Sequence, residues 1–177
     1  GYVQDLEIEH FHWMMDINYH GTVHVIHAFL PELMRRKSGY IINIASGGGL
    51  IGIFGYTGYC GSKFAVRGFS DALRYELAPY QIGISVVYPP DTETPQLEYD
   101  ILHKPLETKA LTETAGRMTA DAVAKIIIDA ANRGKQVILP GFEAWLLYFL
   151  STNFGGKVIE WVSKTILHRV ANGKVKS

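Results

Sequence analysis

The run Tyr40-Ile41-Ile42-Asn43-Ile44-Ala45-Ser46, followed by Gly47-Gly48-Gly49, has the pattern of a buried strand that ends at a tight turn. Short apolar runs rich in β-branched residues are typical of strands that are covered on both faces, and the glycines predict where the strand ends. Ser46 is therefore expected at the carboxyl end of this strand. In open parallel α/β sheets ligands bind outside those ends, so the Ser46 hydroxyl is a candidate site group.

Further along, Tyr59-Cys60-Gly61-Ser62-Lys63 places a phenol and an ammonium four residues apart. On a helix this spacing stacks the two groups on one face. A cation within ~4–6 Å favours the phenolate, so we expect Lys63 to lower the pKa of Tyr59 from its ordinary value of about 10. That shift would suit the phenol to proton transfer. We interpret Cys60 as a small helix residue rather than a reactive thiol.

The surrounding segments alternate between helical and strand patterns. Apolar spacing predicts a long helix over residues 8–36, kinked at Pro31, and helices over 56–80 and 119–132. Residues 84–88 and 136–140 have strand patterns. The expected fold class is α/β, with a Rossmann-like, doubly wound, mostly parallel sheet and helices on both faces.

Composition narrows the class of protein. The 177 residues, 47% of them apolar, predict one domain with a substantial core. The 17 basic and 17 acidic residues argue against a nucleic-acid partner. The single cysteine suits a reducing compartment, so we expect a cytoplasmic protein.

The segment 91–118 mixes Pro, Thr and Glu with little apolar periodicity. Long irregular segments in compact domains are usually functional or disordered. Two interpretations stay open here, a substrate lid and a solvated linker.

We expect residues 143–177 to form hydrophobic or amphipathic helices after the Rossmann-like part, residues 1–142. Apolar runs at 145–150 and 158–167 are interrupted by Gly155-Gly156, and neither is long enough to span a bilayer. Three roles stay open: an interface in a homodimer or homotetramer, a cover over an acyl-chain pocket, and peripheral contact with a membrane surface. Cations that would face lipid headgroups are Lys157, Lys164, His168, Arg169, Lys174 and Lys176.

His20, His24 and His27 share helical spacing, which raises the question of a metal site. Neither a cysteine nor a carboxylate completes a ligand set in the sequence pattern, so we expect no metal and interpret this helix face as a subunit contact.

Asn18, in Asp16-Ile17-Asn18-Tyr19-His20-Gly21, completes a pattern with Ser46, Tyr59 and Lys63. These four residues resemble the Asn-Ser-Tyr-Lys catalytic tetrad of the short-chain dehydrogenase/reductase family. The resemblance implies reduction of a ketone with hydride from NADPH. It implies that Tyr59 donates the proton, Ser46 binds the carbonyl oxygen, Lys63 holds the nicotinamide ribose and Asn18 keeps a proton-relaying water.

The string Tyr88-Pro89-Pro90-Asp91-Thr92-Glu93-Thr94-Pro95, with Lys104-Pro105-Leu106-Glu107-Thr108 after it, is similar to the 3-ketodihydrosphingosine reductases, a branch of that family. Pro90 replaces the glycine that is usual in the family. The resemblance implies a long-chain keto sphingoid base as substrate, and cofactor contacts from Pro89, Thr92 and Thr94 in addition to Tyr59 and Lys63. We expect Ser46, Asp91 and Glu93 to contact the substrate, the carboxylates facing its amine; loop capping by the same side chains is the alternative.

Two other functions stay open: reduction of another hydrophobic carbonyl, such as a steroid, retinoid or acyl-chain ketone, and a non-catalytic lipid-binding or assembly role. A Gly-rich turn after a strand, which would hold the pyrophosphate, does not precede Asn18. We therefore expect this chain to be the carboxyl-terminal part of a longer polypeptide whose front part carries most of the cofactor site and sets the preference between NADP and NAD.

Overall fold

The computed structural model describes residues 1–112, 116–154 and 156–173. The strands are β1 (Gly39–Ile44), β2 (Ile82–Val87), β3 (Thr92–Glu93), β4 (Met118–Thr119) and β5 (Val137–Ile138). The α-helices are α1 (Ile8–Met15), α2 (Gly21–Arg36), α3 (Thr57–Leu77), α4 (Pro95–His103), α5 (Leu106–Thr112), α6 (Ala120–Asn132), α7 (Gly141–Asn153) and α8 (Lys157–Ala171). A π-helical turn, η2 (Asp16–His20), joins α1 to α2, and 3-10 turns occur at η1 (Val3–Asp5), η3 (Gly47–Gly49) and η4 (Ala78–Tyr80).

The main sheet has the strand order β1-β2-β5, and both pairings are parallel. Strand β1 pairs with β2 from Gly39 opposite Ile82 to Ile44 opposite Val87. A second sheet pairs β3 with β4, also in parallel. The predicted mostly parallel α/β architecture is therefore confirmed.

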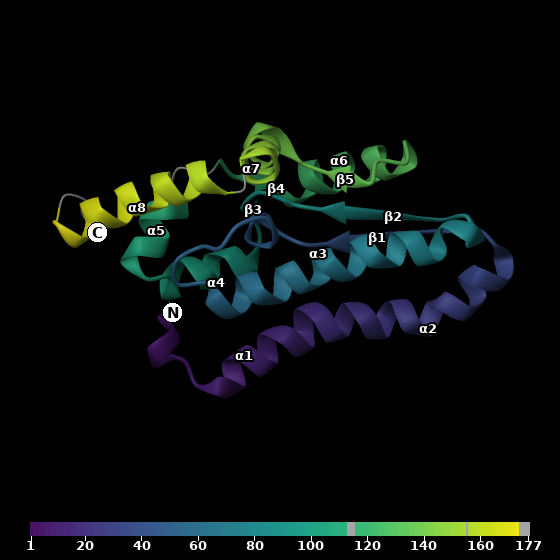
Figure 1. Cartoon of the computed structure of the whole chain (residues 1–177), viewed down its shortest axis with the longest axis horizontal. Coiled ribbons are helices and arrows are strands. Elements are labelled where there is room, and N and C mark those ends of the chain that lie inside the picture. Colours follow the sequence, from purple (N-terminus) through teal and green to yellow (C-terminus); the bar gives the residue numbers. More distant parts are fainter. Residues whose placement is uncertain (113–115, 155, 174–177) are drawn as a thin grey trace.

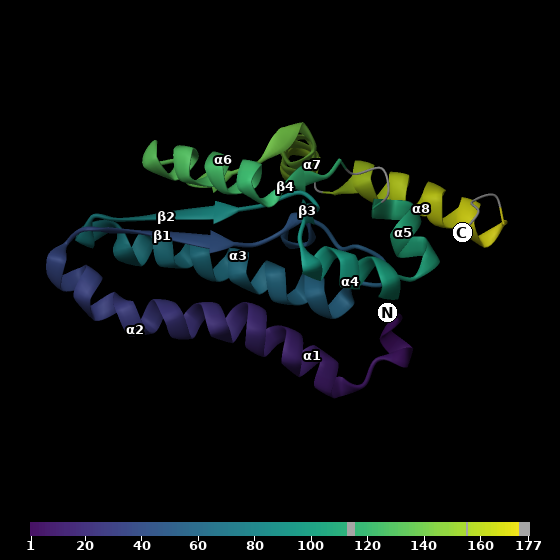
Figure 2. The same cartoon turned by 180° about the vertical axis from the view of Figure 1, so that it is seen from behind.

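Helices cover both faces of the main sheet (Figures 1 and 2). Helices α2 and α3 lie on one face, and α6 lies on the other. Helices α4, α5 and α8 gather beyond the end of the sheet to which the β1 and β2 arrows point. This end, where the carboxyl ends of the strands meet, is where an α/β sheet usually binds its ligands.

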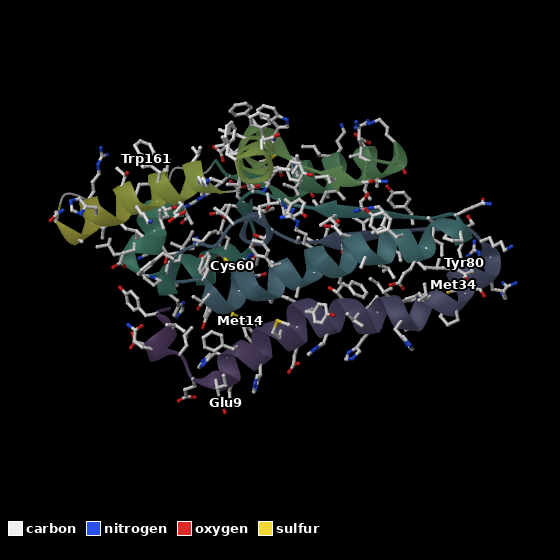
Figure 3. The ribbon with its side chains drawn as sticks, in the orientation of Figure 1. Glu9, Met14, Met34, Cys60, Tyr80 and Trp161 are labelled. Carbon is white, nitrogen blue, oxygen red and sulfur yellow. The ribbon has the colours of Figure 1, made fainter. Side chains whose placement is uncertain are left out.

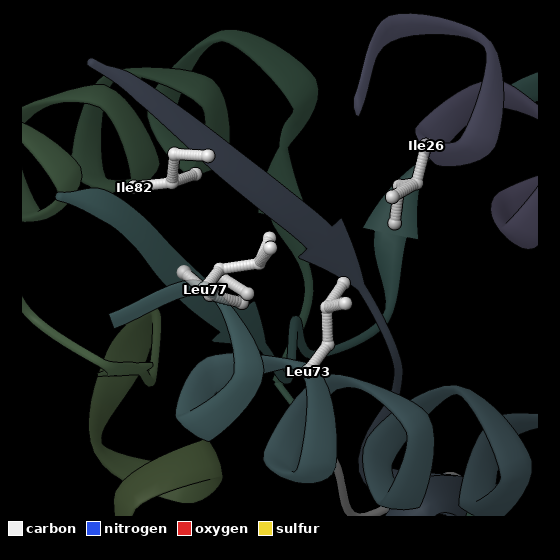
Figure 4. Close-up of a cluster of buried hydrophobic side chains, with 5 residues drawn as sticks. Ile26, Leu73, Leu77 and Ile82 are labelled. Carbon is white, nitrogen blue, oxygen red and sulfur yellow. The ribbon is translucent and has the colours of Figure 1, made fainter. Parts of the chain in front are cut away.

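The core between the sheet and its two helices is apolar (Figure 4). The buried residues of this cluster are Ile26 from α2, Leu73 and Leu77 from α3, and Ile82 and Ile84 from β2. Leu73 and Leu77 are four residues apart and so share one face of α3. That face fixes how α3 is rotated against the sheet.

The predicted helix over residues 8–36 forms, but it contains a turn that sequence spacing did not indicate. Asn18 lies in the π-helical turn η2, between α1 and α2. Such turns carry one extra residue and often occur at functional sites. Pro31 lies inside α2, which continues to Arg36. Met14 of α1 and Cys60 of α3 mark the two helices where they lie side by side, and Met34 and Tyr80 mark the opposite end of the layer (Figure 3).

Of the two interpretations of residues 91–118, the structure contradicts the solvated linker, and the substrate lid stays a prediction. The segment is not a solvated linker, because it forms β3, α4, α5 and β4, with Lys104 and Thr108 buried. The start of α4 has a helix-capping sequence that apolar periodicity does not detect. The Thr94 hydroxyl accepts from the Leu97 amide at 3.3 Å, and Pro95 occupies the first turn, a position that proline favours.

Helices α6, α7 and α8 make up most of the described carboxyl-terminal part of the chain. The Thr119 hydroxyl caps α6 by accepting from the Ala122 amide at 3.3 Å. Helices α7 and α8 follow, and within the described residues no helix has the length and apolar character to cross a bilayer. Exposed aromatic side chains occur on both helices, among them Trp161 on α8 (Figure 3).

We predict that Leu77→Ala lowers the free energy of unfolding by about 2–5 kcal/mol, because Leu77 is only 2% exposed and truncation leaves a cavity in the core. The matched control is Leu102→Ala on α4, where the side chain is 76% exposed and the expected change is within about 0.5 kcal/mol. Denaturant unfolding of the complete protein measures both. Equal effects would contradict this assignment of the core.

Candidate active site

Ser46 leaves the main sheet just beyond β1. The ladder continues for one residue past the strand, since the Ala45 amide donates to the Val87 carbonyl at 2.9 Å. Ser46 then caps η3, where its Oγ accepts from the Gly48 amide at 3.2 Å. The hydroxyl is thus held at the carboxyl end of β1, as the sequence predicted, and its own proton is left for another acceptor.

Tyr59 lies in the first turns of α3, directly beside the glycine-rich turn. A Cβ atom at Gly48 would lie 3.1 Å from Cε1 of the Tyr59 ring. That separation is tighter than ordinary van der Waals contact, so the absence of a side chain at Gly48 lets the backbone approach the ring. This close approach gives a physical role to one glycine of the run that ends the strand.

The electrostatics of Tyr59 correct the expectation from spacing. Burial raises the pKa of the Tyr59 phenol above its ordinary value, while hydrogen bonding with Ser46 opposes the shift. Lys63 does lie near the ring, with Nζ 5.7 Å from its centroid. Burial lowers the pKa of Lys63, and its Nζ donates to the Ile44 carbonyl at 3.2 Å. Removal of the phenol from water is therefore the main cause of the shift, and the nearby ammonium does not reverse it.

Asn18 is joined to Tyr59 through a residue that sequence reasoning did not select. The Asn18 Nδ2 donates to Ser62 Oγ at 3.0 Å, and Ser62 Oγ donates to the Tyr59 carbonyl at 2.7 Å. The Asn18 carbonyl in turn accepts from the Thr22 hydroxyl at 2.8 Å. Ser62 lies inside the Tyr59–Lys63 motif, so its position was visible, but its contact with Asn18 depends on how α3 packs against η2.

The segment after β2 reaches the same end of the sheet. The Tyr88 amide donates to the Ile138 carbonyl at 3.0 Å, and Pro89 and Pro90 follow. The Thr92 hydroxyl donates to the Pro90 carbonyl at 2.9 Å. The Thr94 hydroxyl donates to the Thr92 carbonyl at 3.2 Å in addition to capping α4. Both threonine hydroxyls thus have partners within their own turn.

The two carboxylates that sequence analysis assigned to the substrate differ in their surroundings. Asp91 lies 3.8 Å from the Lys104 ammonium, whereas Glu93 is exposed in β3. Asp91 therefore already has a cationic neighbour in the protein. Lys104 belongs to the Lys104-Pro105-Leu106-Glu107-Thr108 string, but the contact itself is a property of the folded chain.

Contacts of Thr108 with Phe54 and Gly55 attach the segment 91–112 to the loop before α3. The Thr108 hydroxyl donates to the Phe54 carbonyl at 2.8 Å. A Cβ at Gly55 would clash with Thr108 Oγ1, and the φ of Gly55 is +78°, in the left-handed region that favours glycine. The helices α4 and α5 are therefore anchored beside the start of α3, where Tyr59 lies.

The histidines on the first long helix make local contacts. His20 Nδ1 lies 2.8 Å from the Asp16 carboxylate, and the His20 and His24 rings are stacked with centroids 6.4 Å apart. Among residues 1–112, 116–154 and 156–173, the structure places no three His, Cys, Asp or Glu side chains together as metal ligands.

The side chains at the carboxyl end of β1 fit the nicotinamide-ribose end of a dinucleotide. Tyr59 supplies a phenol, and Lys63 an ammonium that makes only one hydrogen bond among the described residues. Ribose hydroxyls accept hydrogen bonds from such donors. This donor set matches the chemistry that the family resemblance implies for the two residues.

The fold and this arrangement define a class of protein. A sequence model of the family described as short chain dehydrogenase matches residues 1–103, and the chain belongs to that family. Over 151 residues the chain is 40% identical to a 3-dehydrosphinganine reductase of Danio rerio and 38% identical to a 3-ketodihydrosphingosine reductase of Bos taurus. Each match covers 85% of this chain and 46% of the relative, so the chain spans about half the length of these relatives.

Solved structures share the fold. A short chain dehydrogenase of Burkholderia cenocepacia in complex with NADP matches 86% of this chain and 58% of its own, with a TM-score of 0.72 and 20% identity. A short-chain dehydrogenase of Streptomyces avermitilis matches 99% of this chain and 66% of its own, with a TM-score of 0.73 and 21% identity. The Rossmann-like fold predicted from the sequence is thereby confirmed.

Proposed function

We propose that the protein is an NADPH-dependent reductase that converts the ketone of a long-chain 2-amino ketone, 3-ketodihydrosphingosine, to a secondary alcohol. The observation that carries this proposal is the partly buried Tyr59 phenol beside the Ser46 hydroxyl at the carboxyl end of a parallel sheet. The names of the Danio rerio and Bos taurus relatives support the substrate class. NADPH rather than NADH follows the same resemblance and agrees with the NADP complex of the Burkholderia cenocepacia protein, whose likeness concerns the fold.

Tyr59 is the proposed general acid. When bound, NADPH supplies hydride to the carbonyl carbon. Tyr59 donates a proton to the carbonyl oxygen as negative charge builds on it. Since burial raises the pKa of Tyr59, the phenol keeps its proton at neutral pH, which suits reduction.

Ser46 stabilises the same oxygen. Its Oγ accepts from the Gly48 amide, which leaves the hydroxyl proton to be donated, and the developing alkoxide would accept it in place of the Tyr59 oxygen. The η3 turn holds the hydroxyl in place before the substrate arrives, which is the condition under which such a donor lowers an activation barrier.

The remaining predicted residues have supporting roles in this proposal. Lys63 holds the nicotinamide ribose, and Asn18 keeps a water that passes protons toward Lys63. The other proposed cofactor contacts come from Pro89, Thr92 and Thr94 in the segment after β2. Thr94 would orient the carboxamide of the nicotinamide.

The substrate amine is proposed to meet the carboxylates of Asp91 and Glu93. Around Lys104 the structure gathers one ammonium and two carboxylates, those of Asp91 and Asp100, at 3.8 and 3.2 Å. That group carries an excess negative charge even though Asp91 has a cationic neighbour. An ammonium next to the substrate carbonyl would complement it.

We expect Tyr59→Phe to lower ketone reduction by at least ~10²-fold, because it removes the proton donor without changing the shape of the ring. The control is Tyr75→Phe on the same helix, where the side chain is 79% exposed and activity should persist. NADPH oxidation by the complete protein measures turnover, and fluorescence titration checks that the dinucleotide still binds. Full turnover in Tyr59→Phe would refute the assignment of the general acid.

We expect the double variant Asp91→Asn, Glu93→Gln to raise the KM for the amino ketone ~10-fold or more, through loss of a charge-assisted contact. The KM for a matched ketone without the amine should not change. Glu98→Gln, an exposed carboxylate in the first turn of α4, is the control. A panel of steroid, retinoid and acyl-chain ketones in the same assay tests the substrate class. An unaltered KM for the amino ketone would exclude this role for the carboxylates.

The tail helices are proposed to contact a membrane surface from the cytoplasmic side, and the protein is proposed to be a homo-oligomer. Stacked Phe142, Trp145 and Phe149 rings, with centroids 5.6 and 5.5 Å apart, project from α7, and α8 carries Trp161 among basic residues. Exposed aromatics beside cations suit an anionic lipid surface. Exposed Trp13, Val25 and Phe29 on α1 and α2 offer a separate apolar face for a second copy.

Sedimentation of the complete protein with anionic vesicles tests both contacts. We expect it to pellet with the vesicles, and the double variant Trp145→Ser, Trp161→Ser to remain in solution because apolar insertion is lost. Without vesicles, we expect sedimentation to give a molecular mass above that of one chain for both the parental protein and the double variant. Co-sedimentation of the variant at the parental level would contradict the membrane contact, and a monomeric mass would contradict the oligomer.

A further inference from the structure

Lys104 is a buried cation beside the site that the proposed reaction does not use. It follows α4 as its C-cap, and its side chain is only 4% exposed. Removing an ammonium from water is costly unless charged or polar partners replace the water. The partners of Lys104 therefore indicate what the buried charge does.

Those partners come from three different segments of the chain. The Lys104 ammonium lies 3.2 Å from the Asp100 carboxylate on α4 and 3.8 Å from the Asp91 carboxylate after β2. It also donates to the Thr112 hydroxyl on α5 at 3.5 Å. One side chain thus ties the end of β2 to both helices of the segment that covers the start of α3.

The network extends to the ring of the proposed general acid. The Tyr56 hydroxyl donates to the Asp100 carboxylate at 2.5 Å, and the Lys104 ammonium lies 5.8 Å from the Tyr56 ring centroid. The Tyr56 ring meets the Tyr59 ring edge to face, with centroids 5.6 Å apart. Asp100 is therefore linked to Lys104 on one side and, through Tyr56, to Tyr59 on the other.

We propose that Lys104 is a positioning residue: its ammonium compensates the Asp91 and Asp100 carboxylates and, through Asp100, holds the Tyr56 ring against Tyr59. This inference rests on the proposed function, because it assigns a role around the same general acid. Lys104 itself acts through Asp100 and Tyr56 and is not placed at the reacting atoms.

The charges around Tyr59 give the direction of the effect. The titratable groups that face it from the surrounding elements are Tyr56, Cys60, Lys63, Asp91 and Asp100. Both carboxylates raise the pKa of the phenol, because a negative charge disfavours the phenolate. Lys104 offsets those carboxylates, so removal of its charge should raise the pKa of Tyr59 further.

The direction of the pKa change at Tyr59 can be measured in the reverse reaction, oxidation of the alcohol product. That reaction needs the phenolate form of Tyr59. Activity in that direction rises as pH rises through the pKa of Tyr59. If Lys104→Met raises that pKa, the rising limb of the pH–activity profile moves to higher pH. At a fixed pH on that limb, kcat/KM falls by about 3- to 10-fold. Asp100→Asn should move the limb the opposite way, to lower pH.

The experiment compares variants of the complete protein. Lys104→Met removes the charge at similar length, Lys104→Arg keeps it, and Lys125→Met makes the same change at an exposed position on α6. Among these three variants, we expect only Lys104→Met to shift the rising limb of the pH–activity profile. Ultraviolet difference titration of the phenol, with the signal of Tyr59→Phe subtracted, should show the same displacement without any turnover.

Two further variants keep the test decisive if the buried methionine prevents folding. Asp100→Asn alone should shift the rising limb of the pH–activity profile to lower pH. The double variant Lys104→Met, Asp100→Asn should return the limb toward the parental position, because one charge of each sign has been removed. A folded Lys104→Met, or an Asp100→Asn, whose limb and phenol titration coincide with those of the parental protein overturns the proposal. Absence of ketone reduction by the parental protein would instead overturn the proposed function, while the phenol titration would still report on Lys104.

Discussion

Parallel pairing of β1 with β2 is the interaction from which the arrangement of the site follows. Gly39 to Ile44 run alongside Ile82 to Val87 in the same direction, so both strands end at one edge of the sheet. Ser46 and the segment that begins with Pro89 leave the sheet there, although more than forty residues separate them in the chain. An antiparallel pairing would send them to opposite edges and leave no common site.

Helix α3 turns this edge into a chemical arrangement because its buried face fixes its rotation. Val66, Leu73 and Leu77 pack into the core, and the buried Ser70 hydroxyl accepts from the Asn43 side chain at 2.8 Å and so ties the helix to β1. With that face held, Tyr59 and Lys63 point toward the end of the sheet. The hydrogen bonds from Asn18 to Ser62 and from Ser62 to Tyr59 attach the first long helix to the same turn.

Burial is the main cause that raises the pKa of Tyr59, and hydrogen bonding with Ser46 opposes it. The ammonium of Lys63 lies close to the ring, but it is itself desolvated and donates to a backbone carbonyl. The carboxylates of Asp91 and Asp100 raise the pKa of the phenol further, and they lie 3.8 and 3.2 Å from the Lys104 ammonium. The protonation of one phenol is thus set by groups from β1, α3, α4 and the segment after β2.

The linear pattern of residues was enough for the strands around Tyr40 and Ile84, the helix that carries Tyr59 and Lys63, and the parallel α/β class, because periodicity and glycine placement are local properties of the chain. It was not enough for the π turn at Asn18, for the helical character of residues 95–112, or for the direction of the pKa shift at Tyr59. Those features depend on contacts between distant segments: α1 against α3, Thr108 against Phe54, and Lys104 against two carboxylates. Desolvation and long-range pairing arise only when the chain has folded, and for that reason the spacing of Tyr59 and Lys63 could indicate the chemistry but not its electrostatic balance.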